Sequence, residues 1–239
     1  MLKSLPILLA LIYGLVLYHF SAWRTRRELK AQSKLLTDKR LTSEIDRLAH
    51  TLNFKEISVF VYEIDPINGL AAPDGKIYIT RGLYEKFLNG DFTASEIASV
   101  VAHELGHVAL NHSRRRMIDF SGQNALRAAL GMVLARFLPG IGVWVANGLM
   151  TLLVARLSRS DEYEADEYAA ALLTKAGIGV EPQISLLRKL DEAARLSRRT
   201  PPAWLMSHPK TAQRIEALEK LRAKWRLQIA SSKRDDNRD

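Results

Sequence analysis

Two histidines four positions apart, with a glutamate directly after the first, constrain this chain more than any other feature. The five residues from His103 to His107 read HELGH. Residues four apart lie on nearly the same face of a helix, one turn apart, so both imidazoles can bind one metal ion. Glu104, one position on, reaches a metal-bound water, which the ion acidifies and whose proton the carboxylate takes. The string therefore predicts half of a hydrolytic metal site.

The surrounding sequence places this string inside a helix. Residues Thr93 to Glu96 form a capping box, which predicts a helix from Ala94 to about Ser113. Apolar residues such as Ile97 and Val100 pack it into the core, where two histidines and a glutamate are costly to bury without a partner. A metal ion is such a partner. His112 lies off the metal face of a helix of this length, so we expect it to be structural.

A second segment offers the third ligand that a catalytic zinc site of this type needs. Residues 158–166 read SRSDEYEAD, and Glu162 and Asp166 are again four apart. We expect Glu162 to bind the ion and Asp166 to accept the outer N–H of a ligand histidine. Asp161 and Glu164 are interpreted as solvated acidic residues in the first turn of a helix, where its dipole favours them.

Length and composition limit the remaining interpretations. The 239 residues suffice for one good-sized core, and the absence of cysteine excludes disulfides and thiolate ligands, so zinc must use histidine and carboxylate. The net charge of +9 suits anionic lipid head groups at least as well as nucleic acid. Since there is no recognisable nucleic-acid motif, we expect polypeptide and membrane lipid as partners and no nucleic acid.

The N-terminal segment predicts a membrane anchor. Residues 5–23 are almost wholly apolar and just long enough to cross a bilayer, and no small-residue cleavage site follows, so a retained anchor is favoured over a signal peptide. Basic residues follow the segment, which favours a cytoplasmic catalytic domain on a single-pass protein of the bacterial inner membrane. We expect an anchor at 1–23, a catalytic domain at 24–229 and a disordered tail at 230–239.

The rest of the pattern predicts an α+β domain that is mainly helical, with a small β-sheet. The expected strands are 56–64 and 76–80, and the expected further helices are one or two within 27–53, then 161–174, 181–196 and 211–227. An apolar insert at about 125–157 cannot cross a membrane once, because metal ligands flank it on both sides. It is a buried helical hairpin, a re-entrant loop or, as we favour, a helical pair on the lipid surface.

Three ordered motifs resemble a known family. HELGH, SRSDEYEAD and then Ser207-His208-Pro209 with Arg214-Ile215 are similar to the zinc endopeptidases that include the HtpX heat-shock protease, the CAAX prenyl-protein endopeptidase and BepA. The likeness runs from about Asn68 to Ile215. It implies a zincin-like fold and one Zn²⁺ per chain. It also implies that His103, His107 and Glu162 are the zinc ligands and that Glu104 is the general base. Asp166 would then lie behind the ligands, and His208 would lie near the metal.

The resemblance adds the role of His208 and a substrate site. The histidine of the SHP motif either stabilises the oxyanion or occupies the open zinc position. Asn68, Gly69, Leu70 and Ala71 resemble the start of the family's edge strand, beside which an extended substrate lies. Here Gly69-Leu70 replaces the usual Ala-Phe, which alters the expected substrate contact.

These features together predict a membrane-anchored zinc metalloendopeptidase. The expected substrates are misfolded or membrane-associated proteins, a quality-control role that the resemblance alone implies. The alternative is a chaperone or assembly factor with a protease fold and little hydrolysis.

Overall fold

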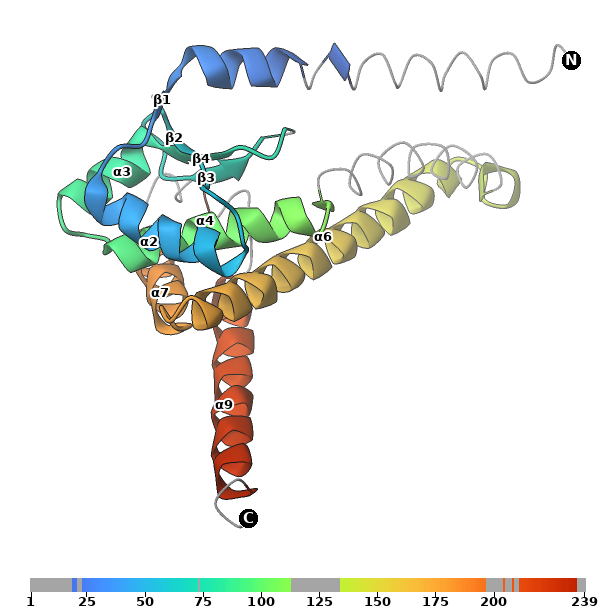
Figure 1. Cartoon of the computed structure of the whole chain (residues 1–239). Helices are drawn as coiled ribbons and strands as arrows, with labels where there is room; N and C mark the ends of the chain where they lie inside the picture. The colour runs from blue at the N-terminus through green and yellow to red at the C-terminus, as the bar shows by residue number, and fades with distance from the viewer. Residues whose placement is uncertain are drawn as a thin grey trace, which may run out of the picture.

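The computed structural model describes residues 19–20, 23–72, 74–112, 134–196, 204, 208 and 211–235 (Figure 1). The described chain is mainly helical with one four-stranded sheet, which confirms the predicted class of fold. The helices are α2 (Lys39–Thr51), α3 (Arg81–Leu88), α4 (Ala94–Ala109), α6 (Gly142–Lys175), α7 (Glu181–Leu196) and α9 (Thr211–Asp235), and residues 23–31 are also helical.

The sheet has the strand order β1-β2-β4-β3, so β3 (Gly69–Ala71) forms one edge. β2 (Val59–Tyr62) and β4 (Ile77–Thr80) run parallel, while β1 (Ser33–Leu35) and β3 pair antiparallel with their neighbours. The two predicted strands correspond to β2 and β4. β1 and β3 are each three residues long, too short to produce an alternating pattern that can be recognised in the sequence.

Both faces of the central strand β4 are covered. Ile77 and Ile79 belong to the main core, beneath which α4 packs, while Tyr78 points to the other face and packs with Leu29 and Ala72. Since side chains alternate along a strand, one strand joins both clusters. The sheet is therefore held between α4 on one side and the helix of residues 23–31 on the other.

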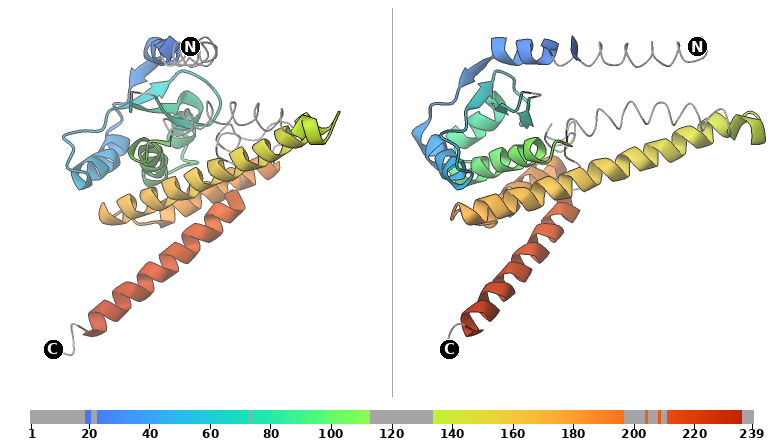
Figure 2. Two further views of the ribbon diagram at one scale, coloured as in Figure 1. Left: turned by 90° about the vertical axis from the view of Figure 1, so that its right-hand side faces the viewer. Right: turned by 45° about the vertical axis from the view of Figure 1, so that its right-hand side comes forward.

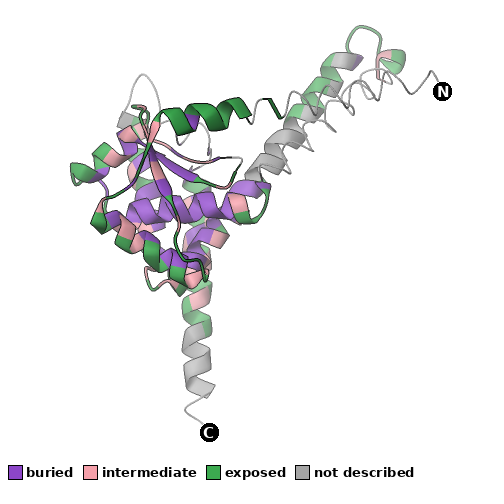
Figure 3. Cartoon of the chain, turned by 45° about the horizontal axis from the view of Figure 1, so that its top comes forward, coloured by how far each residue is buried: buried purple, intermediate pink, exposed green. Residues whose placement is uncertain are grey.

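The helix α4 runs through the middle of the molecule and is buried over nearly its whole length (Figure 3). Its capping box has the predicted geometry: Glu96 N donates to Thr93 Oγ1 at 3.2 Å, and Thr93 N donates to Glu96 Oε2 at 2.8 Å. α2, α6 and α7 pack around it. The helix ends at Ala109, earlier than the predicted end near Ser113, because Asn111 adopts a left-handed conformation at φ 54°.

The helix α6 is 34 residues long and extends well beyond the body of the molecule (Figure 2). The predicted helix 161–174 is only its C-terminal part. Phe137 and Trp144, near the far end, are 74% and 77% exposed, so this end of the apolar insert is not buried within the protein. The first part of the expected insert, 125–133, lies outside the described residues.

The expected membrane anchor also lies mostly outside the described residues, which include only positions 19, 20 and 23 of it. Within the ranges described, no helix combines the length and the apolar composition that a membrane crossing requires. At the other end, α9 continues to Asp235, beyond the predicted helix end at residue 227.

Candidate metal centre

The two histidines of the HELGH string converge as their spacing predicts. His103 Nε2 and His107 Nε2 lie 3.1 Å apart, and the rings meet edge to face with centroids 4.7 Å apart. Both residues are buried in the middle of the molecule, at 1% and 6% exposure. The Nε2 atoms of both rings thus come together at one point beside α4.

Glu162 comes to this point from α6. Its Oε2 lies 3.5 Å from His103 Nε2, and its Oε1 lies 3.6 Å from His107 Nε2. Gly106 permits the approach of the two helices, because a Cβ at that position would lie 3.0 Å from the carbonyl oxygen of Ala165. The glycine within HELGH is therefore what allows the carboxylate to reach the imidazole pair.

His208 completes the cluster. Its Nε2 lies 3.6 Å from Glu104 Oε1 and 4.0 Å from Glu162 Oε2, and its ring stacks on Trp204 with centroids 4.2 Å apart. Its Nδ1 lies 3.3 Å from the Trp204 carbonyl oxygen, so Nδ1 is the nitrogen that carries the proton. Burial, followed by the charge on His103, lowers the pKa of His208 to about 3. A neutral imidazole therefore turns the lone pair of Nε2 towards the cluster.

These residues fit a metal ion. Within the described part of the chain, one donor atom from each of His103, His107, Glu162 and His208 lies within 4.8 Å of the other three, and all four side chains are buried. Imidazole nitrogen and carboxylate oxygen are the donors that zinc takes where cysteine is absent. All four residues were predicted as site residues from the sequence, although His208 was implied only by the resemblance to the family.

Asp166 supports the cluster from behind. Its Oδ1 lies 3.0 Å from His103 Nδ1, the nitrogen that faces away from the other ligands. Arg214, at the start of α9, donates from Nε and Nη2 to the two oxygens of Asp166 at 2.6 and 2.7 Å. Burial raises the pKa of Asp166, but the charges of Arg214 and His103 and their hydrogen bonds to the carboxylate together outweigh this and hold it far below the usual value. Sequence reasoning assigned Arg214 no role, because nothing local shows that it is buried.

The cluster holds a proton when no cation is bound. Burial lowers the pKa of His103, but hydrogen bonds with Asp166 and Glu162 outweigh it and raise the pKa to about 9. Burial likewise raises the pKa of Glu162, while the interaction with His103 and the positive charges around the carboxylate together bring it down to about 2. At neutral pH a protonated imidazole thus lies between two carboxylates. A cation that binds here displaces this proton.

Glu104 lies beside the cluster and is 3% exposed. Burial, together with the negative charge of Glu162, raises its pKa to about 7, although the charge of His103 and a hydrogen bond from the Ala71 backbone oppose the rise. A carboxylate with a pKa near the working pH is well suited to accept and return a proton.

This pKa predicts how peptide hydrolysis depends on pH. Only the ionised Glu104 can accept a proton, so kcat/KM should fall about tenfold per pH unit on the acid side. The acid limb should lie at or below about pH 7, since a bound cation can only lower the pKa from the metal-free value. The measurement is kcat/KM for a fluorogenic peptide against pH. A profile with an alkaline limb alone contradicts the assignment.

The predicted substrate strand lies directly against Glu104. A Cβ on Gly69 would lie 2.5 Å from Val100 Cγ1 and 3.7 Å from Glu104 Cγ, so a larger residue does not fit here unless the Val100 side chain moves. Gly69, Leu70 and Ala71 form β3, and the Asn68 amide donates to Thr80 Oγ1 at 2.9 Å just before it. An edge strand therefore passes the carboxylate at contact distance.

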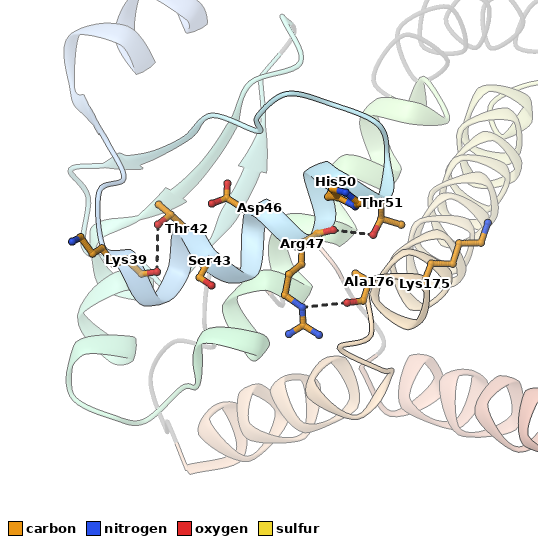
Figure 4. A pocket seen from close by; sticks show the side chains of 9 residues that line it. All are labelled: Lys39, Thr42, Ser43, Asp46, Arg47, His50, Thr51, Lys175 and Ala176. Carbon is orange, nitrogen blue, oxygen red and sulfur yellow. Dashed lines mark hydrogen bonds between the residues drawn. The ribbon is translucent and has the colours of Figure 1, made fainter.

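A separate cavity of about 570 Å³ lies between α2 and the C-terminal end of α6 (Figure 4). None of the residues that line it belongs to the metal cluster, and its lining includes Lys39, Arg47, His50 and Lys175. Arg47 is held by the Ala176 carbonyl oxygen at 3.2 Å. The cavity is a surface hollow apart from the candidate centre.

Comparison with known proteins agrees with this geometry. The chain is 29% identical over 188 residues to metalloprotease LoiP of Escherichia coli (strain K12), covering 74% of this chain and 68% of LoiP. It is 30% identical over 223 residues to the beta-barrel assembly-enhancing protease of the same organism, covering 87% of this chain but 44% of that protein. Metalloprotease YcaL of E. coli is 28% identical over 182 residues, 74% of this chain and 67% of YcaL. The chain thus spans less than half the length of the assembly-enhancing protease.

The predicted localisation needs correction. A single-pass anchor in the inner membrane with a cytoplasmic catalytic domain conflicts with the match to the beta-barrel assembly-enhancing protease. That localisation is therefore wrong.

The family itself is established by a match over most of the chain. The model of peptidase family M48 matches residues 35–222, a range that includes β2, β3, β4, α4, α6 and all four candidate ligands. The relatives above are named as metalloproteases or as a protease, in agreement with a buried cluster that could hold a metal. The chain belongs to peptidase family M48.

Proposed function

We propose that this protein is a zinc-dependent endopeptidase that cleaves extended or unfolded polypeptides. The observation that carries the proposal is the buried group of three imidazoles and one carboxylate, with Glu104 and the edge strand β3 beside it. Metal ligands, a candidate base and a peptide-binding edge thus meet at one point. Membership of a metalloprotease family supports the same conclusion.

In this proposal His103, His107 and Glu162 hold one zinc ion. When bound, zinc would polarise the scissile carbonyl and lower the pKa of a water molecule. Glu104 takes the proton from the attacking water and delivers it to the leaving amine, and its raised pKa suits both transfers. Asp166, fixed by Arg214, keeps the outer nitrogen of His103 in place.

The geometry favours one of the two roles considered for His208. An imidazole that stabilises an oxyanion must present an N–H to it. The proton of His208 lies on Nδ1, directed to the Trp204 carbonyl oxygen, so Nε2 has a lone pair to offer. We therefore propose that His208 would be the fourth residue to hold the metal, through Nε2, and that a bound substrate would replace it.

The substrate is proposed to add a strand to the sheet. β3 is an edge, and its pairing with β4 leaves its outer side to another chain. Pairing of this kind reads the backbone, which implies broad specificity for extended polypeptide. Because Gly69 lies against Glu104, a peptide on β3 would bring a backbone carbonyl close to the base.

Removal of metal tests the proposal. Purified protein is expected to contain about one zinc per chain, measured by elemental analysis, and to cleave an unfolded protein such as casein. Dialysis against a chelator should abolish cleavage, and one equivalent of zinc should restore it. Equal cleavage with and without bound metal, or a folded protein that takes up no zinc, would overturn the proposal.

A further inference from the structure

His112 lies directly behind the metal ligand His107. The two Nδ1 atoms are 2.7 Å apart, the ring centroids are 4.9 Å apart, and His112 is 1% exposed. The left-handed Asn111 creates this contact, because it ends the path of α4 and turns the chain back towards the preceding turn. On a continuous helix, position 112 would point about 140° away from position 107, the arrangement assumed in the sequence analysis.

The far side of His112 faces acidic residues of α6. Its Nε2 lies 3.5 Å from Glu164 Oε2 and 4.0 Å from Asp161 Oδ1. These two residues were expected to be solvated in the first turn of a helix. The first-turn position is wrong for both residues, because α6 begins at Gly142. Solvation is wrong for Asp161, which is 4% exposed, whereas the Glu164 side chain is 41% exposed. His112 therefore connects a metal ligand on α4 to carboxylates on the helix that carries Glu162.

The positions of the protons follow from this arrangement. A metal on His107 Nε2 needs the lone pair of that atom, so the ring proton must lie on Nδ1. This N–H can donate to His112 Nδ1, which must then be an acceptor. The His112 proton therefore lies on Nε2, which faces the carboxylates of Glu164 at 3.5 Å and Asp161 at 4.0 Å. His103 has the equivalent support more directly, from Asp166 at 3.0 Å.

We propose that His112 is a positioning residue for the metal site, which fixes the orientation and tautomer of His107 through the Nδ1 contact. This inference rests on the proposed metal-dependent function. Outer partners that accept the second N–H of a ligand histidine typically change metal affinity by about 10- to 100-fold when they are removed. His112 would do for His107 what Asp166 does for His103.

The test compares zinc affinities of the full chain by competition with a chromophoric chelator at fixed pH. His112→Phe keeps a ring but removes the acceptor, and should weaken binding about 10- to 100-fold. His112→Asn, whose side-chain oxygen can take the place of Nδ1, should recover most of the affinity. His50→Phe, at an exposed position on α2, is the matched control and should bind like the wild type. Equal affinity in the wild type and in a folded His112→Phe overturns the inference.

A second measurement needs no variant. In ¹⁵N NMR of the zinc-loaded wild type, whose six histidines can be assigned, His107 should carry its proton on Nδ1 and His112 on Nε2. The opposite tautomer of His112 overturns the inference even if His112→Phe does not fold. If the folded wild type binds no zinc, the proposed function itself fails. The two failures are therefore distinguishable.

Discussion

Replacing Glu104 by glutamine is expected to leave zinc bound and to lower kcat for peptide hydrolysis by about 10²- to 10⁴-fold, the usual contribution of a general base. The substitution keeps the size of a side chain that is 3% exposed. It removes a carboxylate beside the cluster that can take a proton from water and has a pKa raised to about 7. Zinc content and peptide turnover, measured on the same preparation, check the result.

Glu167→Gln is the matched control. Glu167 lies on α6 near the site but is exposed, so its replacement should change neither metal content nor turnover. Unchanged turnover in Glu104→Gln would remove Glu104 from the mechanism. The same variant also tests the chaperone alternative. If the protein acts as a chaperone with little hydrolysis, wild type and Glu104→Gln should rescue a deletion strain equally well.

The helix that carries HELGH could be predicted because its signals are local. The capping box fixes where it begins, and the spacing of four fixes that His103 and His107 share a face. The same spacing logic placed Glu162 and Asp166 on one side of a second helix. The sequence did not show how closely that helix approaches α4. This distance depends on Gly106, which fits against the backbone of Ala165.

The role inferred for His112 was missed because one residue changes the direction of the chain. Asn tolerates a left-handed conformation, but it does so in few of its occurrences, so Asn111 gave no firm sign that the helix ends. Counting positions along an unbroken helix then moved His112 away from His107. Similarly, the apolar stretch and the acidic motif were treated as separate elements, although α6 is one helix from Gly142 to Lys175.

Arg214 illustrates the part of a site that no local pattern contains. Its partner Asp166 lies 48 residues earlier in the chain, and the pair is recognisable only when α6 and α9 are placed together. An arginine in an amphipathic helix ordinarily lies on the solvated face. Here it is 1% exposed, and its charge balances carboxylates that would otherwise be costly to bury.

The substitution Glu162→Ala is expected to weaken zinc binding by more than the 10- to 100-fold that loss of an outer partner typically causes, since it removes a ligand. Competition with a chelator at fixed pH measures the change, and Glu167→Ala on the exposed side of α6 is the control. Equal affinity in the wild type and a folded Glu162→Ala would show that another residue is the third ligand.

The metal-free state makes this prediction sharper. Glu162 Oε2 lies 3.5 Å from His103 Nε2, and Asp166 and Glu162 are the two carboxylates that raise the pKa of this imidazole to about 9. Its removal should lower the pKa of His103, so that a proton competes less with the metal at neutral pH. Proton competition alone would therefore strengthen zinc binding in Glu162→Ala. A loss of affinity in spite of this effect, in a variant that keeps its fold, is the result expected if Glu162 binds the ion.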